Sequence, residues 1–146
     1  MNPDSTYSTS FEDYSNYLNN FLTFNVYDTL DNALISIFNE NIPYDYYDLP
    51  NYTIGKLAAT AYRTNNTDDW NFKYYKYDAR GRVIKQWNLI DGNLYTTDYD
   101  YNSANQVVVE KHSDWLSNSK KFIYDYDNAG RMHSTLGYKT PIEFES

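Results

Sequence analysis

The chain has 146 residues, carries a formal net charge of −8 and contains no cysteine, which excludes disulfides, thiolate catalysis and cysteine-bound metal. Aromatic residues make up 19% of the chain, and 18 of them are tyrosines, which favour half-buried β-sheet surfaces. The acidic balance disfavours nucleic-acid binding. The first residues lack the basic and apolar regions of a signal peptide, and no apolar run approaches the ~20 residues that cross a membrane, so we expect no membrane insertion.

The N-terminal segment, residues 1–42, allows two interpretations. Apolar residues at helical spacing predict a helix over 11–22. Residues 28–38 fit a helical stripe, but Tyr27-Asp28 begins a faint copy of the repeat described next, which favours strands. The segment is therefore a short helical element or a degenerate repeat, and helix and strand stay open for 28–38.

A motif recurs along the central segment, residues 43–133. Its clearest copy reads YKYDARGRV at 75–83, and YDYNSANQV at 99–107 and YDYDNAGRM at 124–132 align with it. The residues at the seventh position of the three copies lie 24 and 25 residues apart; they are Gly81, Asn105 and Gly130. A tandem repeat of about this length is typical of one supersecondary unit per copy.

A more divergent copy lies upstream of these three. Gly55-Lys56-Leu57 stands 26 residues before Gly81 and corresponds to the second half of the motif. Tyr47-Asp48 precedes it through a longer loop, so we expect these two residues to supply the first half.

The repeat predicts strand, tight turn, strand. Glycine and asparagine tolerate positive φ best, and an Asp or Asn three or four residues earlier closes an Asx-type turn. Asp91-Gly92 between apolar runs adds a hairpin signal. We therefore expect a mainly β fold, an antiparallel β-meander or ribbon. The residues that define the repeat turns are Tyr77, Asp78, Gly81, Arg82, Tyr101, Asn102, Asn105, Tyr126, Asp127, Gly130 and Arg131.

The motif resembles the YD repeat of Rhs and teneurin-like proteins. Residues 75–83 match the pattern Tyr-x-Tyr-Asp, two residues, Gly-Arg, aliphatic at every position, and 124–132 match nearly so. Residues 99–107 depart at Asn102, Asn105 and Gln106.

This resemblance implies a non-catalytic scaffold. In that family, many units form a β-sheet ribbon that spirals into a shell around a C-terminal region, often a toxin. The implied partner is the rest of a larger Rhs-type polypeptide or its toxin region. Members are exported or on the cell surface, and the sequence leaves the location of this chain unknown. A few units cannot close a shell, so we expect open sheet edges that allow self-association.

The C-terminal tail, residues 134–146, is expected to be rich in turns, with Pro141 ending regular pairing. Residues 131–144 resemble the terminal motif of insertion-sequence transposases with an integrase-type core. The transposase catalytic domain would lie where the repeats stand, so this resemblance implies a hybrid remnant without activity of its own.

Binding of carbohydrate through exposed aromatic rings is the alternative function, and Trp70, Trp87 and Trp115 are its candidate residues. Catalytic and metal sites are not expected. The calcium-like run that begins at Asp125 lacks its closing glutamate, and the two histidines, His112 and His133, have no partner at catalytic spacing. No cofactor motif is present in the sequence.

Overall fold

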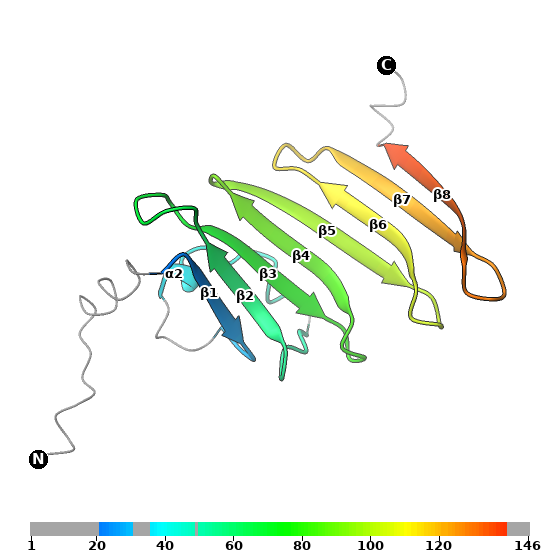
Figure 1. Ribbon diagram of the computed structural model, residues 1–146, viewed down its shortest axis with the longest axis horizontal. Coiled ribbons are helices and arrows are strands. Elements are labelled where there is room, and N and C mark those ends of the chain that lie inside the picture. Colours follow the sequence, from blue (N-terminus) through cyan, green and yellow to red (C-terminus); the bar gives the residue numbers. More distant parts are fainter. Residues whose placement is uncertain (1–20, 31–35, 49, 140–146) are drawn as a thin grey trace, which may run out of the picture.

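The protein is a single antiparallel sheet whose strands follow one another in chain order (Figure 1). The computed structural model describes residues 21–30, 36–48 and 50–139. The eight strands and one short helix are β1 Thr23–Tyr27, α2 Ser36–Asn39, β2 Leu57–Tyr62, β3 Asn71–Tyr77, β4 Val83–Ile90, β5 Asn93–Tyr101, β6 Val107–Ser113, β7 Ser119–Tyr126 and β8 Met132–Lys139. The predicted mainly β meander is confirmed.

The sheet is wider than the predicted central segment. Residues 23–27 form β1 and pair with β2, so the faint copy of the repeat begins at the last residue of a strand. Of residues 28–38, for which helix and strand were both open, the described residues 28–30 are neither, and 36–38 belong to the short helix α2, Ser36–Asn39. The helix predicted over 11–22 lies outside the described residues, except for Phe21 and Leu22, which are not helical.

The predicted turn-rich tail is wrong over residues 134–139. These residues belong to β8, which pairs with β7 from Met132 to Lys139. The pairing is possible because the first proline of the tail is Pro141, and every residue before it retains a backbone N–H for the ladder. Residues 140–146 lie outside the described part of the chain.

The Asp91-Gly92 hairpin is confirmed. Ile90 pairs directly with Asn93, which leaves a two-residue connection between β4 and β5. Both connecting residues have positive φ, 50° at Asp91 and 77° at Gly92. This is the conformation that matches the right-handed twist of the flanking strands.

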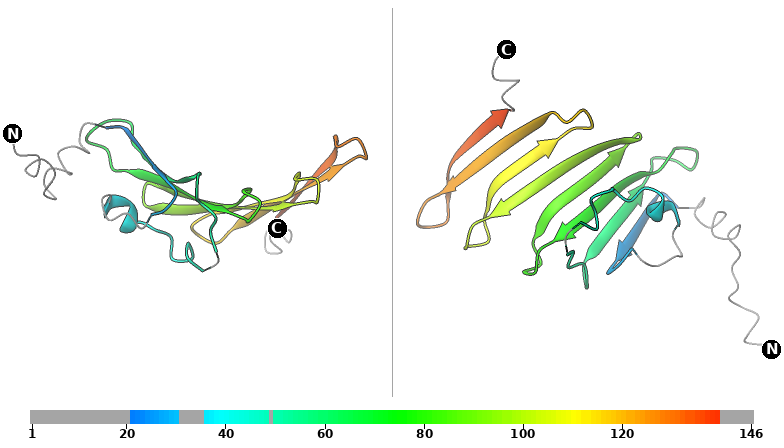
Figure 2. Two further views of the ribbon diagram at one scale, coloured as in Figure 1. Left: turned by 90° about the horizontal axis from the view of Figure 1, so that it is seen from below. Right: turned by 180° about the vertical axis from the view of Figure 1, so that it is seen from behind.

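A segment that we call the strap, residues 36–48 and 50–56, packs on one face of the sheet over β1 to β4 (Figure 2). Phe38 and Tyr46 from the strap pack against Tyr74 and Trp87 on the sheet, and their rings meet edge-on or tilted. The core cluster also contains Val26, Leu30, Ala58, Ala59, Ala61 and Phe72. We call the face of the sheet that the strap covers the strap face, and the opposite face the open face.

The strands beyond β4 have no second layer among the described residues (Figure 2). Side chains of β6 and β7 are half-buried or exposed, and the buried apolar side chains of the core come from β1 to β4, from the strap and from Leu30 just after β1. Within the described part of the chain, no helix has the length and apolar character needed to cross a bilayer.

Candidate functional site: a ladder of turns at one edge of the sheet

The turn between β3 and β4 is held by one carboxylate. Asp78 Oδ1 accepts hydrogen bonds from the backbone N–H groups of Arg80 and Arg82, at 2.9 and 3.0 Å. Its Oδ2 accepts one from Arg82 Nε at 2.7 Å. Gly81 has a φ of 80° and donates its N–H to the carbonyl of Asp78. The predicted Asx-type turn is thus present, and Arg82 pairs with the aspartate of its own turn.

The ion pair within this turn shifts the titration of Asp78. Burial raises the pKa of its carboxyl group, but hydrogen bonds from the backbone and side chain of Arg82, together with the Arg82 charge, outweigh it. The net result is a pKa below the ordinary value of 3.8. The carboxylate therefore stays ionised and acts as a hydrogen-bond acceptor.

The other two predicted turns share this geometry. Asp127 Oδ1 accepts from the N–H groups of Ala129 and Arg131, and its Oδ2 lies 2.9 Å from Arg131 Nε. In the copy at residues 99–107, which departs from the motif, Asn102 Oδ1 accepts from the N–H groups of Ala104 and Gln106.

The copy at residues 99–107 has a neutral hydrogen-bonded pair in place of the ion pair. Asn102 Nδ2 donates to Gln106 Oε1 at 2.8 Å, where the other copies have a carboxylate and a guanidinium. Asn105 takes the glycine position with a φ of 62°. The departures of residues 99–107 from the motif therefore preserve the turn, because Asn102 keeps the oxygen that accepts the two backbone N–H groups and its amide nitrogen donates to Gln106.

In the first turn of the ladder, the two halves of the motif are far apart in the sequence. The prediction of which residues form the first half was wrong. Gly55 donates its N–H to Asp28 Oδ1 at 2.6 Å, and Asp28 donates its N–H to the carbonyl of Lys56 at 3.0 Å. The first half of the motif is therefore Tyr27-Asp28 and not Tyr47-Asp48. Residues 29–54, which include most of the strap, are an insertion into a repeat turn.

Tyrosine hydroxyls link each turn to the preceding one. Tyr77 donates its hydroxyl to the carbonyl of Leu57 at 2.8 Å, and Tyr101 donates to that of Val83 at 2.6 Å. Tyr126 continues the series to the carbonyl of Val107 at 2.7 Å. In each case the acceptor is the first residue of the previous return strand.

A long polar side chain links each turn to the following one. Arg82 donates from Nη1 to Asn105 Oδ1 at 3.1 Å, and its guanidinium lies 4.6 Å from the ring centroid of Tyr101. Gln106 donates to the carbonyl of Gly130 at 2.9 Å. Lys56 extends toward Gly81 and places its ammonium 5.7 Å from the ring centroid of Tyr77.

We call this side chain the arm of the turn; the arms are Lys56, Arg82, Gln106 and Arg131. The arms of the first three turns all point toward the next turn along the chain. Their role could be anticipated only in part from the sequence, because the motif places a polar residue there without showing what it reaches.

The turn between β6 and β7, at the opposite ends of the strands, is of the same kind, and the sequence did not reveal it. Asp114 Oδ1 accepts from the N–H groups of Leu116 and Asn118, and Ser117 has a φ of 67°. The repeat pattern does not identify this turn, because Ser117 stands at the positive-φ position in place of glycine or asparagine.

The three candidate tryptophans do not share a surface. Trp87 is 0% exposed, and its indole N–H donates to Asp45 Oδ1 at 2.8 Å, so its prediction as a carbohydrate-binding residue is wrong. Trp70 is half-buried, with the Arg63 guanidinium 4.2 Å from its ring centroid. Trp115 is 53% exposed and is the one of the three with an accessible ring.

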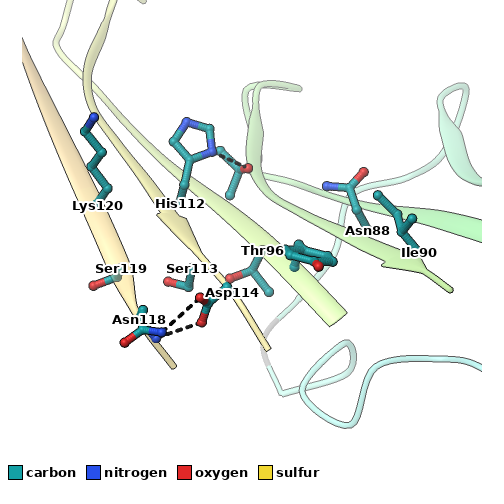
Figure 3. A pocket seen from close by; sticks show the side chains of 11 residues that line it. Asn88, Ile90, Thr96, His112, Ser113, Asp114, Asn118, Ser119 and Lys120 are labelled. Atoms are coloured by element: carbon teal, nitrogen blue, oxygen red, sulfur yellow. Dashed lines mark hydrogen bonds between the residues drawn. The ribbon is translucent and has the colours of Figure 1, made fainter. Parts of the chain in front are cut away.

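Two open hollows lie beside β5 to β7. One, of about 390 Å³, is on the strap face and is lined by Tyr44, Lys85, Lys111 and Trp115, among others. The other has a volume of about 400 Å³. Figure 3 shows it on the open face, where Asn88, His112 and Lys120 extend from neighbouring strands.

His112 has contacts at both ring nitrogens. Its Nδ1 lies 3.1 Å from the Thr97 hydroxyl, and its Nε2 lies 2.7 Å from Glu110 Oε1. Tyr124 donates its hydroxyl to the other oxygen of Glu110 at 2.9 Å, which raises the pKa of Tyr124. The cluster therefore ties together three strands. In the described residues, no group of three or more metal-ligating side chains occurs.

A scan against protein-family models finds no match for this chain, and a search of curated proteins finds none either.

Proposed function

We propose that this chain is a non-catalytic structural scaffold, a segment of β-sheet wall of the Rhs or YD-repeat type. In a longer polypeptide, such a wall encloses a C-terminal toxin or effector region. The observation that carries the proposal is the ladder of turns, in which tyrosine hydroxyls bond backward and arms reach forward. Each turn serves its neighbours, as expected of a laterally repeating wall.

The way the polar groups are used supports a structural role. Asp78 and Asp127, the carboxylates of the motif, each accept hydrogen bonds within their own turn. His112 and Glu110 bond to each other and to adjacent strands. These side chains are therefore engaged in hydrogen bonds that stabilise the sheet.

The proposal can be tested by widening the wall. Residues 107–131, which comprise β6, β7 and two turns, would be duplicated directly after Arg131. A repeating wall accepts the added unit in register, so the far-ultraviolet β signal and the urea m-value both increase, because m scales with the surface exposed on unfolding. An insertion of the same residues in scrambled order is the control.

Hydrogen exchange decides between the outcomes. Slow exchange in the duplicated strands supports the wall, and fast exchange there with a folded remainder would show that the sheet is not extendable. Such a result would overturn the proposal, since lateral repetition is its basis.

A second candidate function is carbohydrate binding at the hollow on the strap face. Tyr44 and Trp115 are both exposed there, and Lys85, Lys111 and Asp114 offer hydrogen-bonding groups beside them. Rings beside polar groups suit the flat faces and hydroxyls of sugars. Titration of a panel of oligosaccharides should change tryptophan fluorescence in the native protein and not in Trp115→Ala. No response to any saccharide would remove this candidate.

A further inference from the structure

We infer that the two side edges of the sheet are complementary and that copies of this chain associate head to tail, β8 of one copy beside β1 of the next. The partner that fits these edges is a second copy of the chain. The inference follows from what the ladder contains at each end.

At the β8 side of the sheet, the last arm has no further turn to reach among the described residues. Arg131 is the last of the four arms, and its side chain is 80% exposed, whereas the equivalent Arg82 is 23% exposed. Within the described residues, Arg131 bonds only to Asp127 of its own turn, through Nε. Its two terminal nitrogens make no hydrogen bond to any described residue.

The N-terminal edge has the matching unfilled position. Tyr27 is equivalent to Tyr77 and Tyr101, yet it is 58% exposed, and its hydroxyl makes no hydrogen bond within the described residues. The turn that follows Tyr27 receives no arm from a described residue. Among the described residues, a Cβ built on Gly55 would meet nothing within 4 Å, whereas one built on Gly81 would meet the arm of the preceding turn.

The register of a second copy follows from the ladder itself. Arg131 would lie over the ring of Tyr27 and reach Gly55, as Lys56 lies over Tyr77 and reaches Gly81. Tyr27 would donate its hydroxyl to the carbonyl of Met132, the first residue of β8. A carbonyl oxygen has two lone pairs, so this bond is compatible with the contacts that Met132 already makes.

The strand directions also fit. The sheet has eight strands in strict antiparallel order, so β1 and β8 run in opposite directions (Figure 1). A copy displaced sideways without inversion therefore continues the antiparallel alternation, and the backbone edges can pair by strand addition. Because the interface uses two different edges, it does not close in a dimer, and growth continues to longer ribbons.

Sedimentation velocity from micromolar to millimolar protein tests the inference. The native chain should form species that lengthen with concentration. Arg131→Ala and Tyr27→Ala should each weaken association roughly tenfold or more, since each removes a hydrogen bond and a ring contact at the interface. Arg131→Gln should retain most of it, because Gln106 reaches the next turn with the same group.

Two variants serve as matched controls. Arg80→Ala removes an arginine next to the same kind of turn without removing an arm. Tyr44→Ala removes an exposed tyrosine that is not on a sheet edge. Both should associate as the native chain does, and circular dichroism should show that all variants keep the sheet.

Mixing the two defective variants gives the decisive result. Tyr27→Ala keeps an intact β8 edge and Arg131→Ala keeps an intact β1 edge, so an equimolar mixture should form heterodimers that do not grow. A symmetric β8–β8 or β1–β1 contact predicts no such heterodimer. A monomer at all concentrations, or association that neither variant weakens, would overturn the head-to-tail contact. These outcomes are separate from the unit duplication, which tests the repeating wall inside one chain.

Discussion

The half of the sheet beneath the strap and the half beyond β4 share one turn design and differ in what covers them. One row of paired residues crosses the strap face from β1 to β7, as the strand registers show; it runs Val26, Ala59, Tyr74, Trp87, Thr96, Ser113, Ser119. The row is apolar under the strap and changes to hydroxyl side chains beyond it. The composition of the row therefore marks where the second layer ends.

This difference separates two sources of stability. Under the strap, aromatic burial against Phe38 and Tyr46 provides the main driving force. Beyond β4, the sheet depends on backbone pairing, on the turn ladder and on clusters such as Glu110 with His112. A single-layer sheet of this kind needs side-chain ladders, because it has no core on either face.

The largest effect should come from removing the central ring of the covered half. Trp87→Ala leaves a cavity beneath the strap and deprives Asp45 of a hydrogen bond, which should lower the free energy of unfolding by about 3–5 kcal/mol. Urea unfolding followed by circular dichroism measures the change. Trp115→Ala is the matched control and should change the free energy of unfolding by less than about 0.5 kcal/mol. Equal losses in the two variants would contradict a core confined to the covered half.

A smaller loss should follow from releasing the strap. Asp45 Oδ2 accepts from Lys85 Nζ at 2.8 Å, while its Oδ1 accepts from the Trp87 indole, so one carboxylate fixes the strap to β4. Asp45→Asn keeps the size of the side chain and removes the charge, and we expect a loss of about 1–3 kcal/mol. Hydrogen exchange should show the opening in the covered half alone, with β6 and β7 unchanged.

The same contact predicts a dependence on pH. Burial raises the pKa of Asp45, but the hydrogen bond and charge of Lys85 and the hydrogen bond of Trp87 outweigh it, so the pKa lies below 3.8. Since the folded pKa is depressed, the stabilisation is present above pH 3.8 and is lost as the pH falls through the folded value. In Asp45→Asn, this part of the acid loss should disappear; an unchanged acid profile would show that other carboxylates carry it.

The sequence predicted the repeating half well and the covered half poorly. The turns at Gly81, Asn105 and Gly130 could be located because positive φ restricts which residues occur there, and that restriction is local. The strap could not be assigned, because its position depends on contacts such as that of Asp45 with Trp87, 42 residues apart.

The split first turn shows the same limit. Tyr47-Asp48 and Tyr27-Asp28 both fit the first half of the motif, and proximity in the sequence favoured the wrong pair. Asp28 reaches Gly55 only because β1 pairs with β2 across a long insertion. Likewise, Trp87 has the alternation of a strand residue, but nothing local indicates which face the strap covers.

An intermediate effect is expected at the turns, where the two halves should respond alike. Gly81→Ala forces a side chain into φ 80° and places a Cβ 2.9 Å from Lys56 Cε, so we expect a loss of about 1–2 kcal/mol. Gly130→Ala, in the single-layer half, should lose a similar amount, because its φ is also 80°. Thermal unfolding measures both. Gly81→Asn should restore part of the loss, since Asn105 occupies the equivalent position; no recovery would indicate that the steric contact with Lys56 dominates.

The smallest effect should come from exchanging one version of the turn for the other. Asp78→Asn together with Arg82→Gln reproduces the Asn102–Gln106 pair, with both backbone hydrogen bonds to the turn retained. The Arg82–Asp78 ion pair lies at the surface with both side chains partly exposed, so its loss should change the free energy of unfolding by about 0–1 kcal/mol. Asp78→Ala removes the acceptor of two N–H groups and should cost more than the double exchange. If the double exchange proved as damaging as Asp78→Ala, charge and not turn shape would hold the ladder, and the neutral copy at Asn102 would be its weakest point.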